Sequence, residues 1–177
     1  MQDTSNWIDN IISGAGAKFS IKLRFSLNSL GTFVLAGKLG ASPVNERQFQ
    51  VLCRPNGDLE FFWYGALDGS NFRGVRATGV VSASVAYVLD ITYNGEINTG
   101  DGLGRIAMYL NGVALSTFIP GGFSVGALSA IALGPAPLSV GASVQSSNQI
   151  NSFAADGKFS GFALYNYIIN SSQIGVF

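Results

Sequence analysis

The sequence contains no histidine and a single cysteine, and both scarcities limit the chemistry open to it. Without histidine, neither a Ser-His-Asp triad nor a histidine-based zinc site can form. Because Cys53 is the only cysteine, no disulfide can form within the chain, and cysteine usage indicates no redox compartment. The sequence therefore predicts a protein that is not an enzyme.

Charge is scarce as well. Lys and Arg together number 10, Asp and Glu together number 10, and charged residues make up 11% of the chain. Since there is no cluster of basic residues, we expect no nucleic-acid partner. The apolar stretch from Val125 to Val144 is interrupted by glycine and proline, including Gly134 and Pro135, which argues against a membrane-spanning helix. No membrane insertion is expected.

The first ten residues, Met1 to Asn10, are polar and acidic. They lack the basic start and the apolar run of a signal peptide. The location is therefore left open, and a virion or an extracellular surface is the location we expect.

Glycine and apolar residues are abundant, with 23 glycines and 47% hydrophobic residues, which favours stacked β-sheets over helices. From Lys18 to Leu27 apolar and polar residues alternate strictly, the period of a strand with one buried face and one wet face. The buried face is predicted to comprise Phe19, Ile21, Leu23, Phe25 and Leu27, and the wet face Lys18, Ser20, Lys22, Arg24 and Ser26.

The stretch from Val85 to Val113 predicts a long antiparallel hairpin, because two alternating limbs flank a glycine-rich connection. Asn111-Gly112 then predicts a tight turn. Further strands are predicted over residues 31–38, 47–54, 58–64, 114–118, 138–143 and 157–167. Residues 65–79 are predicted to be mostly loop, and 143–156 a polar loop. The predicted fold is all-β, an antiparallel two-sheet β-sandwich, with an N-terminal lead over 1–17 and a single domain over 18–177.

The order of these segments resembles the concanavalin A-like jelly-roll domains, in particular their laminin G-like and pentraxin-like branch. The resemblance rests on three pairs of segments. The first is the opening strand, 17–21, with a second strand that contains Gly-Lys, 36–38. The second is a central pair of strands, each ending in Asn-Gly, 87–95 and 105–112, and the third is a glycine-ended strand, 138–142, with the closing strand, 159–166. Phe162-Ala163 stands where family members usually carry an acidic residue after Phe-x-Gly.

Related glucanases use closely spaced carboxylates on one strand for catalysis, and Asp58 and Glu60 have this spacing here. A glycosidase pair also requires burial and a sugar cleft. Asp58 follows an Asn-Gly turn, so we interpret it as a turn residue and Glu60 as a solvated side chain.

Calcium is the one cofactor that the resemblance makes plausible, since several relatives bind it through loop carboxylates and amides. Asn98 and Asp101 are the candidate ligands, with Asn94 and Glu96 in the same loop. The alternative is that these residues serve turn geometry, as Asn and Asp commonly do in glycine-rich hairpin ends.

For a glycan ligand, the sequence offers aromatic side chains for the sugar ring and amide or charged groups for its hydroxyls. The candidate residues are Trp63, Tyr64, Asn71, Arg73, Asn148 and Gln149. Alternate residues of a strand face opposite ways, so Trp63 or Tyr64 can instead belong to the core.

These features lead to two functional hypotheses. The first is a non-catalytic binding module that recognises a surface carbohydrate, in adhesion or host-surface attachment. The alternative is a structural virion component, such as a bacteriophage decoration, fibre or tail protein, whose role is particle assembly. The expected partners are a glycan or other surface ligand, with a homo-oligomer or virion proteins as further possibilities.

Overall fold

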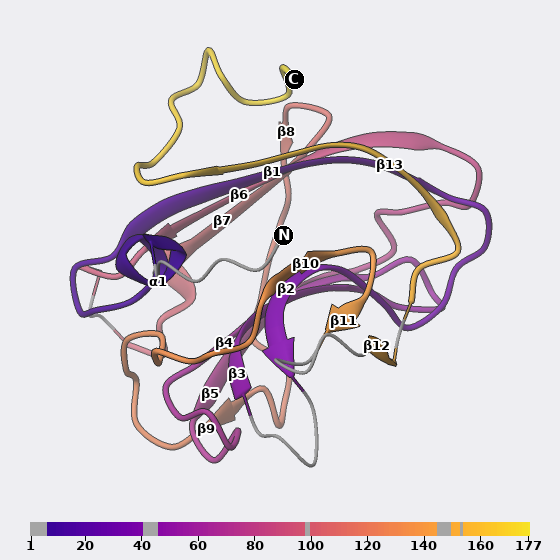
Figure 1. Ribbon diagram of the computed structural model, residues 1–177. Coiled ribbons are helices and arrows are strands. Elements are labelled where there is room, and N and C mark those ends of the chain that lie inside the picture. Colours follow the sequence, from indigo (N-terminus) through magenta and orange to yellow (C-terminus); the bar gives the residue numbers. More distant parts are fainter. Residues whose placement is uncertain (1–6, 41–45, 98–99, 145–149, 153) are drawn as a thin grey trace.

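The computed structural model describes residues 7–40, 46–97, 100–144, 150–152 and 154–177. Two antiparallel sheets pack face to face (Figure 1), which confirms the predicted β-sandwich. The five-stranded sheet consists of β13 (Gly157–Tyr165), β1 (Lys18–Leu27), β6 (Ala86–Asn94), β7 (Ile106–Leu110) and β8 (Val113–Ala114), in this order. The six-stranded sheet consists of β10 (Leu138–Val140), β2 (Phe33–Gly40), β3 (Glu46–Cys53), β4 (Leu59–Tyr64), β5 (Phe72–Ala77) and β9 (Ser124–Val125).

Three smaller elements complete the described structure. A two-stranded sheet joins β11 (Ser143–Val144) to β12 (Ile150–Ser152), and a 3-10 helix η1 (Leu103–Arg105) precedes β7. The helix α1 (Trp7–Ile12) lies at one end of the sandwich (Figure 1). It falls within the predicted lead, and its Ile8 and Ile12 pack into the core. Within the described ranges, no helix has the length and apolar character needed to cross a membrane.

The strand and turn predictions are confirmed where the alternation is strict. β1 has the predicted bounds, and its five alternate apolar side chains are buried between the sheets. β6 and β7 form the predicted hairpin, with Ile91 opposite Met108. Asn111 and Gly112 both have positive φ, 51° and 82°, as a two-residue type I′ turn requires. The largest fully buried side chains are Trp63, Tyr93, Phe19, Phe25, Phe49 and Phe61.

Three segment predictions are wrong, and a fourth is incomplete. Residues 65–79 are predicted to be mostly loop, and the prediction omits β5, which lies within them. The strand predicted over 114–118 is reduced to β8, and Phe118 forms only an isolated bridge with Arg76. The loop predicted over 143–156 contains β11 and β12, and the last strand ends at Tyr165 rather than at residue 167.

Gly74 in β5 makes room for two aromatic rings on the outer face of the six-stranded sheet. A Cβ atom at this position would lie 2.4 and 2.5 Å from two ring atoms of Phe62 and 3.0 Å from one of Phe123. The absence of a side chain therefore lets both rings lie against the strand.

We expect Gly74→Ala to lower the free energy of unfolding by about 1–3 kcal/mol, because the added methyl group displaces well-packed rings. Chemical denaturation measures this change. Gly121→Ala is the matched control, since a Cβ atom there meets nothing within 4 Å. Equal stability of the two variants would contradict the packing described at Gly74.

The outer face of β1 is not wholly wet, contrary to the prediction. Arg24 is exposed, but Ser20 and Lys22 are buried, with exposed fractions of 0% and 2%. The alternation correctly placed both side chains away from the core. They are covered from outside by the segment that follows β13, and the sequence pattern of β1 carries no sign of this cover.

Candidate functional site

The outer face of the six-stranded sheet carries a group of polar and aromatic side chains. In the strand register, Leu52, Glu60 and Arg76 lie side by side, as do Gln50, Phe62 and Gly74. Because the next residues along each strand, such as Phe61, fill the core, these side chains point outward. Charged groups and rings are thus brought together from three neighbouring strands and the turn after β3.

Arg54, Glu60 and Arg76 form what we call the Arg–Glu–Arg cluster. Arg54 Nε donates to Glu60 Oε2 at 2.7 Å, and Arg76 Nε donates to Glu60 Oε1 at 2.8 Å. The Nη2 atom of each arginine contacts the same oxygen as its Nε. The Glu60 side chain is 0% exposed, whereas those of Arg54 and Arg76 are 31% and 27% exposed. One buried carboxylate therefore fixes two guanidinium groups at the surface.

Each arginine keeps donor capacity beyond this pairing. The contacts use Nε and Nη2, and among the described residues no partner is found for Nη1 of Arg54 or Arg76. Asp58 Oδ2 lies 3.5 Å from Arg76 Nε, so two carboxylates balance the two guanidinium charges. The cluster therefore offers oriented N–H donors without a large excess of charge.

An aromatic group flanks the cluster. The ring centroids of Phe62 and Phe123 are 4.6 Å apart, and those of Tyr64 and Phe72 are 5.8 Å apart. The Arg76 guanidinium carbon lies 4.8 Å from the centroid of the Phe123 ring, a cation–π contact that further limits its motion. Phe62 and Tyr64 are buried with Val34, Leu39 and Leu52 as a second apolar cluster outside the main core.

Tyr64 connects the aromatic group to the polar one. Its hydroxyl accepts a hydrogen bond from Gln50 Nε2 at 2.7 Å. Burial raises the pKa of Tyr64 to about 12, against the lowering effect of the positive charges on Arg47 and Arg54 and of the Gln50 hydrogen bond. The phenol therefore stays neutral well above its usual range.

This raised pKa predicts a loss of stability at high pH. The folded-state pKa lies above the ordinary tyrosine value of 10.0, so neutral Tyr64 stabilises the fold below pH 10, and this contribution is lost as pH rises toward 12. At about 1.4 kcal/mol per pH unit, the loss attributable to Tyr64 is about 2–3 kcal/mol. Unfolding at several pH values measures it, and Tyr64→Phe should remove this part of the slope. An unchanged slope in the variant would contradict the assignment.

The structure separates the predicted glycan-binding residues. Trp63 is 1% exposed and packs between the sheets, so it is unsuited to contact a surface ligand. Tyr64 lies on the outer face, although it too is buried. Asn71 and Arg73 lie toward β9: Asn71 Nδ2 donates to Ser129 Oγ, and Arg73 donates to the carbonyl oxygens of Phe72, Val125 and Gly126. Asn148 and Gln149 fall outside the described residues.

The predicted calcium loop is described only in part. Asp101 Oδ1 accepts a hydrogen bond from the Leu103 N–H at 2.9 Å, and Glu96 pairs with Lys18 at 2.6 Å. Asn98 lies outside the described residues. Among the described residues no group of three His, Cys, Asp or Glu side chains could hold a metal ion. Calcium binding stays a prediction.

Sequence reasoning missed the Arg–Glu–Arg cluster, and its interpretation of Glu60 as solvated is wrong. The Glu60 carboxylate is buried because two arginines compensate its charge. A signal was present: a glutamate inside an otherwise apolar strand needs a partner on a neighbouring strand. The partners themselves could not be named without the strand register.

Comparison with known proteins was made at the level of sequence and of structure. No protein-family model and no curated protein matches the sequence. The CBM40 of the Ruminococcus gnavus IT-sialidase, solved with α2,3-sialyllactose, superposes with a TM-score of 0.64 at 13% identity, over 89% of this chain and 80% of that one. The SAP-like pentraxin from Limulus polyphemus gives a TM-score of 0.59 at 16% identity, over 90% of this chain and 69% of that one.

The chain has the concanavalin A-like jelly-roll fold. The NanB sialidase of Streptococcus pneumoniae also contains this sandwich, with a TM-score of 0.69 at 15% identity over 100% of this chain. The match covers only 26% of the sialidase chain. At these identities the likeness concerns the fold, and the fold predicted from the order of strands is confirmed.

Proposed function

We propose that this protein is a carbohydrate-binding module that recognises an acidic sugar on the outer face of its six-stranded sheet. The observation that carries the proposal is the Arg–Glu–Arg cluster, in which buried Glu60 holds Arg54 and Arg76 with donor groups still available. Arginine presents planar, paired N–H donors that match the geometry of a carboxylate. A sugar that bears a carboxylate supplies this acceptor.

The cluster is organised before the ligand arrives. Ion pairing to Glu60 and the contact with the Phe123 ring restrict the Arg76 side chain, so little rotamer freedom is left to lose on binding. Hydrogen bonds between charged groups are about twice as strong as neutral ones. The partly buried rings of Phe72 and Phe123 give the apolar face of a sugar ring a surface to pack against. Binding without bond cleavage is the expected outcome.

One structural neighbour, solved in two complexes, supports the choice of ligand class. The Ruminococcus gnavus CBM40 was solved with both α2,3- and α2,6-sialyllactose, which carry a carboxylate on the terminal sugar. This chain shares the fold with that module, and its own arginines supply the complementary chemistry. The alternative role in virion assembly has no specific observation in its favour among the described residues and stays a prediction.

Isothermal titration of the protein with 3′-sialyllactose, lactose and the methyl ester of 3′-sialyllactose tests the proposal. We expect binding of the first only, because lactose lacks the carboxylate and the ester removes its charge while keeping its shape. Equal binding of all three, or of none, would overturn the proposal. Repeating the titration with a chelator tests the calcium prediction at the same time.

A further inference from the structure

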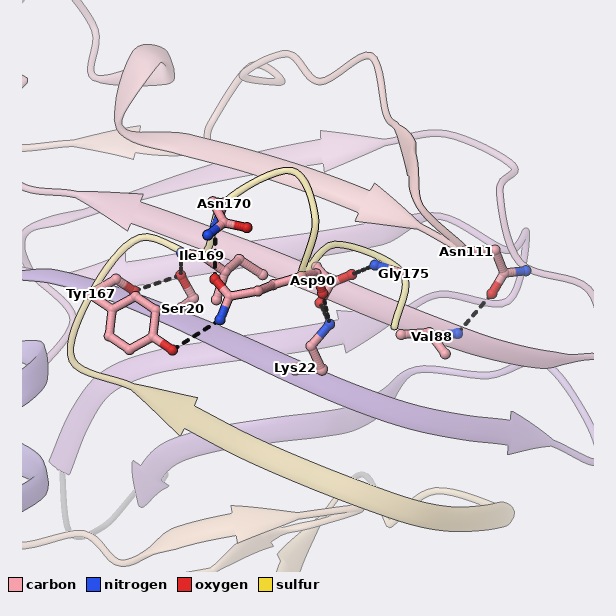
Figure 2. A network of polar contacts seen from close by, with 10 residues as sticks. Ser20, Lys22, Val88, Asp90, Asn111, Tyr167, Ile169, Asn170 and Gly175 are labelled. Carbon is pink, nitrogen blue, oxygen red and sulfur yellow. Dashed lines mark hydrogen bonds and ion pairs between the residues drawn. The ribbon is translucent and has the colours of Figure 1, made fainter. Parts of the chain in front are cut away.

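The outer face of the five-stranded sheet is covered by the segment of residues 166–177, here called the strap. Figure 2 shows the strap crossing β1 and β6, with side chains of the sheet directed at it. Ser20 Oγ donates to the Tyr167 carbonyl oxygen at 2.8 Å and accepts from the Ile169 N–H at 3.0 Å. Lys22 Nζ donates to the Gln173 carbonyl oxygen at 2.8 Å, and Asp90 Oδ2 accepts from the Gly175 N–H at 2.7 Å.

These four contacts share one property, which is that a side chain of the sheet binds a main-chain atom of the strap. Among the strap side chains, Ile169 is the buried apolar anchor, with 3% of its surface exposed. Tyr167, Ile168, Val176 and Phe177 are exposed. The strap is therefore held by backbone hydrogen bonds and one buried side chain, as a bound peptide often is, and the outer surface of β1 and β6 beneath it is here called the groove.

The floor of this groove is polar. Lys22 and Asp90 form an ion pair with side chains only 3% and 0% exposed, and Ser20 lies beside them on β1. At Gly161 of β13 the strap packs against bare backbone, since a Cβ atom there would lie 2.3 Å from a ring atom of Phe177. Withdrawal of the strap exposes a charge-paired surface that water solvates, and the core between the sheets stays closed.

We propose that the strap is exchangeable, and that the groove of one copy of this chain accepts the strap of a second copy. Each chain carries both complementary halves, so the contacts seen within one chain are reproduced in full between two. Ser20 lies opposite Tyr165 in the sheet, and its hydroxyl bonds to the carbonyl oxygen of Tyr167. The chain therefore turns back over β1 within residues 165–167, which form the short link between β13 and the strap. Opening of this link frees the strap to reach a partner. The site lies on a different sheet from the Arg–Glu–Arg cluster and does not depend on the proposed function.

A complementation experiment with full-length chains tests the exchange. Ile169→Asp disables the strap but leaves the groove intact, and Ser20→Val disables the groove but leaves the strap and the Lys22–Asp90 pair intact. We expect each variant alone to be monomeric by native mass spectrometry. An equimolar mixture should form a heterodimer, because it contains one intact groove and one intact strap. Ser26→Val, the same change on the same face of β1 without a contact to the strap, should behave as the unchanged chain.

Hydrogen exchange identifies the cause of each outcome. The amides of Ile169 and Gly175 should exchange fast in either variant alone, and those of the Ser20→Val chain should slow again in the mixture. A monomeric mixture with both straps released would overturn the proposal, since the strap would then act only within its own chain. Straps that stay protected in the single variants would overturn it too, because other contacts would then hold them. If Ser20→Val does not fold, Ser20→Ala removes the same two hydrogen bonds with a smaller side chain.

Discussion

Replacing Arg76 with alanine is expected to lower the affinity for a sialylated glycan about 10- to 100-fold. Arg76 Nε and Nη2 are engaged by Glu60, the Phe123 ring restrains the guanidinium, and the side chain is 27% exposed. A hydrogen bond between charged groups contributes about 1.5–3 kcal/mol, and this loss corresponds to the stated range. Titration with 3′-sialyllactose measures the change. Arg54→Ala should have an effect of the same order, since Arg54 occupies the equivalent place on the other carboxylate oxygen.

The controls separate loss of the site from loss of the fold. Arg76→Lys keeps the positive charge but not the planar pair of donors, so it should bind with intermediate affinity. Arg24→Ala removes an exposed arginine from β1, in the other sheet, and should bind as the unchanged chain does. Unaltered binding by both Arg76→Ala and Arg54→Ala would show that the glycan binds elsewhere. The unfolding temperature of each variant should be recorded beside its affinity.

The parts of the fold that could be predicted are those in which the residue pattern of one segment is enough to indicate its structure and its buried face. β1 alternates over its whole length, and Asn111-Gly112 specifies a turn without reference to any other segment. β5 was missed because its inward positions include Arg73, and its outward positions hold Phe72 and Gly74. Arg73 tolerates the inward position because it lies at the end of the strand, where its guanidinium reaches the carbonyl oxygens of β9 and Gly126.

The candidate site could not be predicted because it depends on strand register. Arg54 and Arg76 lie far apart in the sequence and meet at Glu60 only because β3, β4 and β5 are consecutive neighbours. The aromatic run of β4 drew attention to the correct strand, but alternation divides it between two faces. Trp63 lies inside and Tyr64 outside, so the sequence identified the strand and not the surface.

The buried polar contacts beneath the strap predict a large effect on stability. Asp90→Ala should lower the free energy of unfolding by about 3–5 kcal/mol, because it leaves the Lys22 ammonium buried without its counter-charge. It also removes the acceptor of the Gly175 N–H. Urea denaturation measures the change, with the slope checked for an altered unfolding transition.

Replacing both partners distinguishes a cost of unpaired charge from a contribution of the ion pair itself. The double variant Lys22→Met with Asp90→Leu removes both charges and fills their volume, so we expect it to recover most of the lost stability. Lys22→Met alone should be nearly as unstable as Asp90→Ala, since a carboxylate is then left unpaired under the strap. A double variant no more stable than either single one would mean that the pair holds the strap through its contacts to Gln173 and Gly175. In that case the role of the ion pair is to fix the path of the strap across the sheet, in addition to the mutual neutralisation of two buried charges.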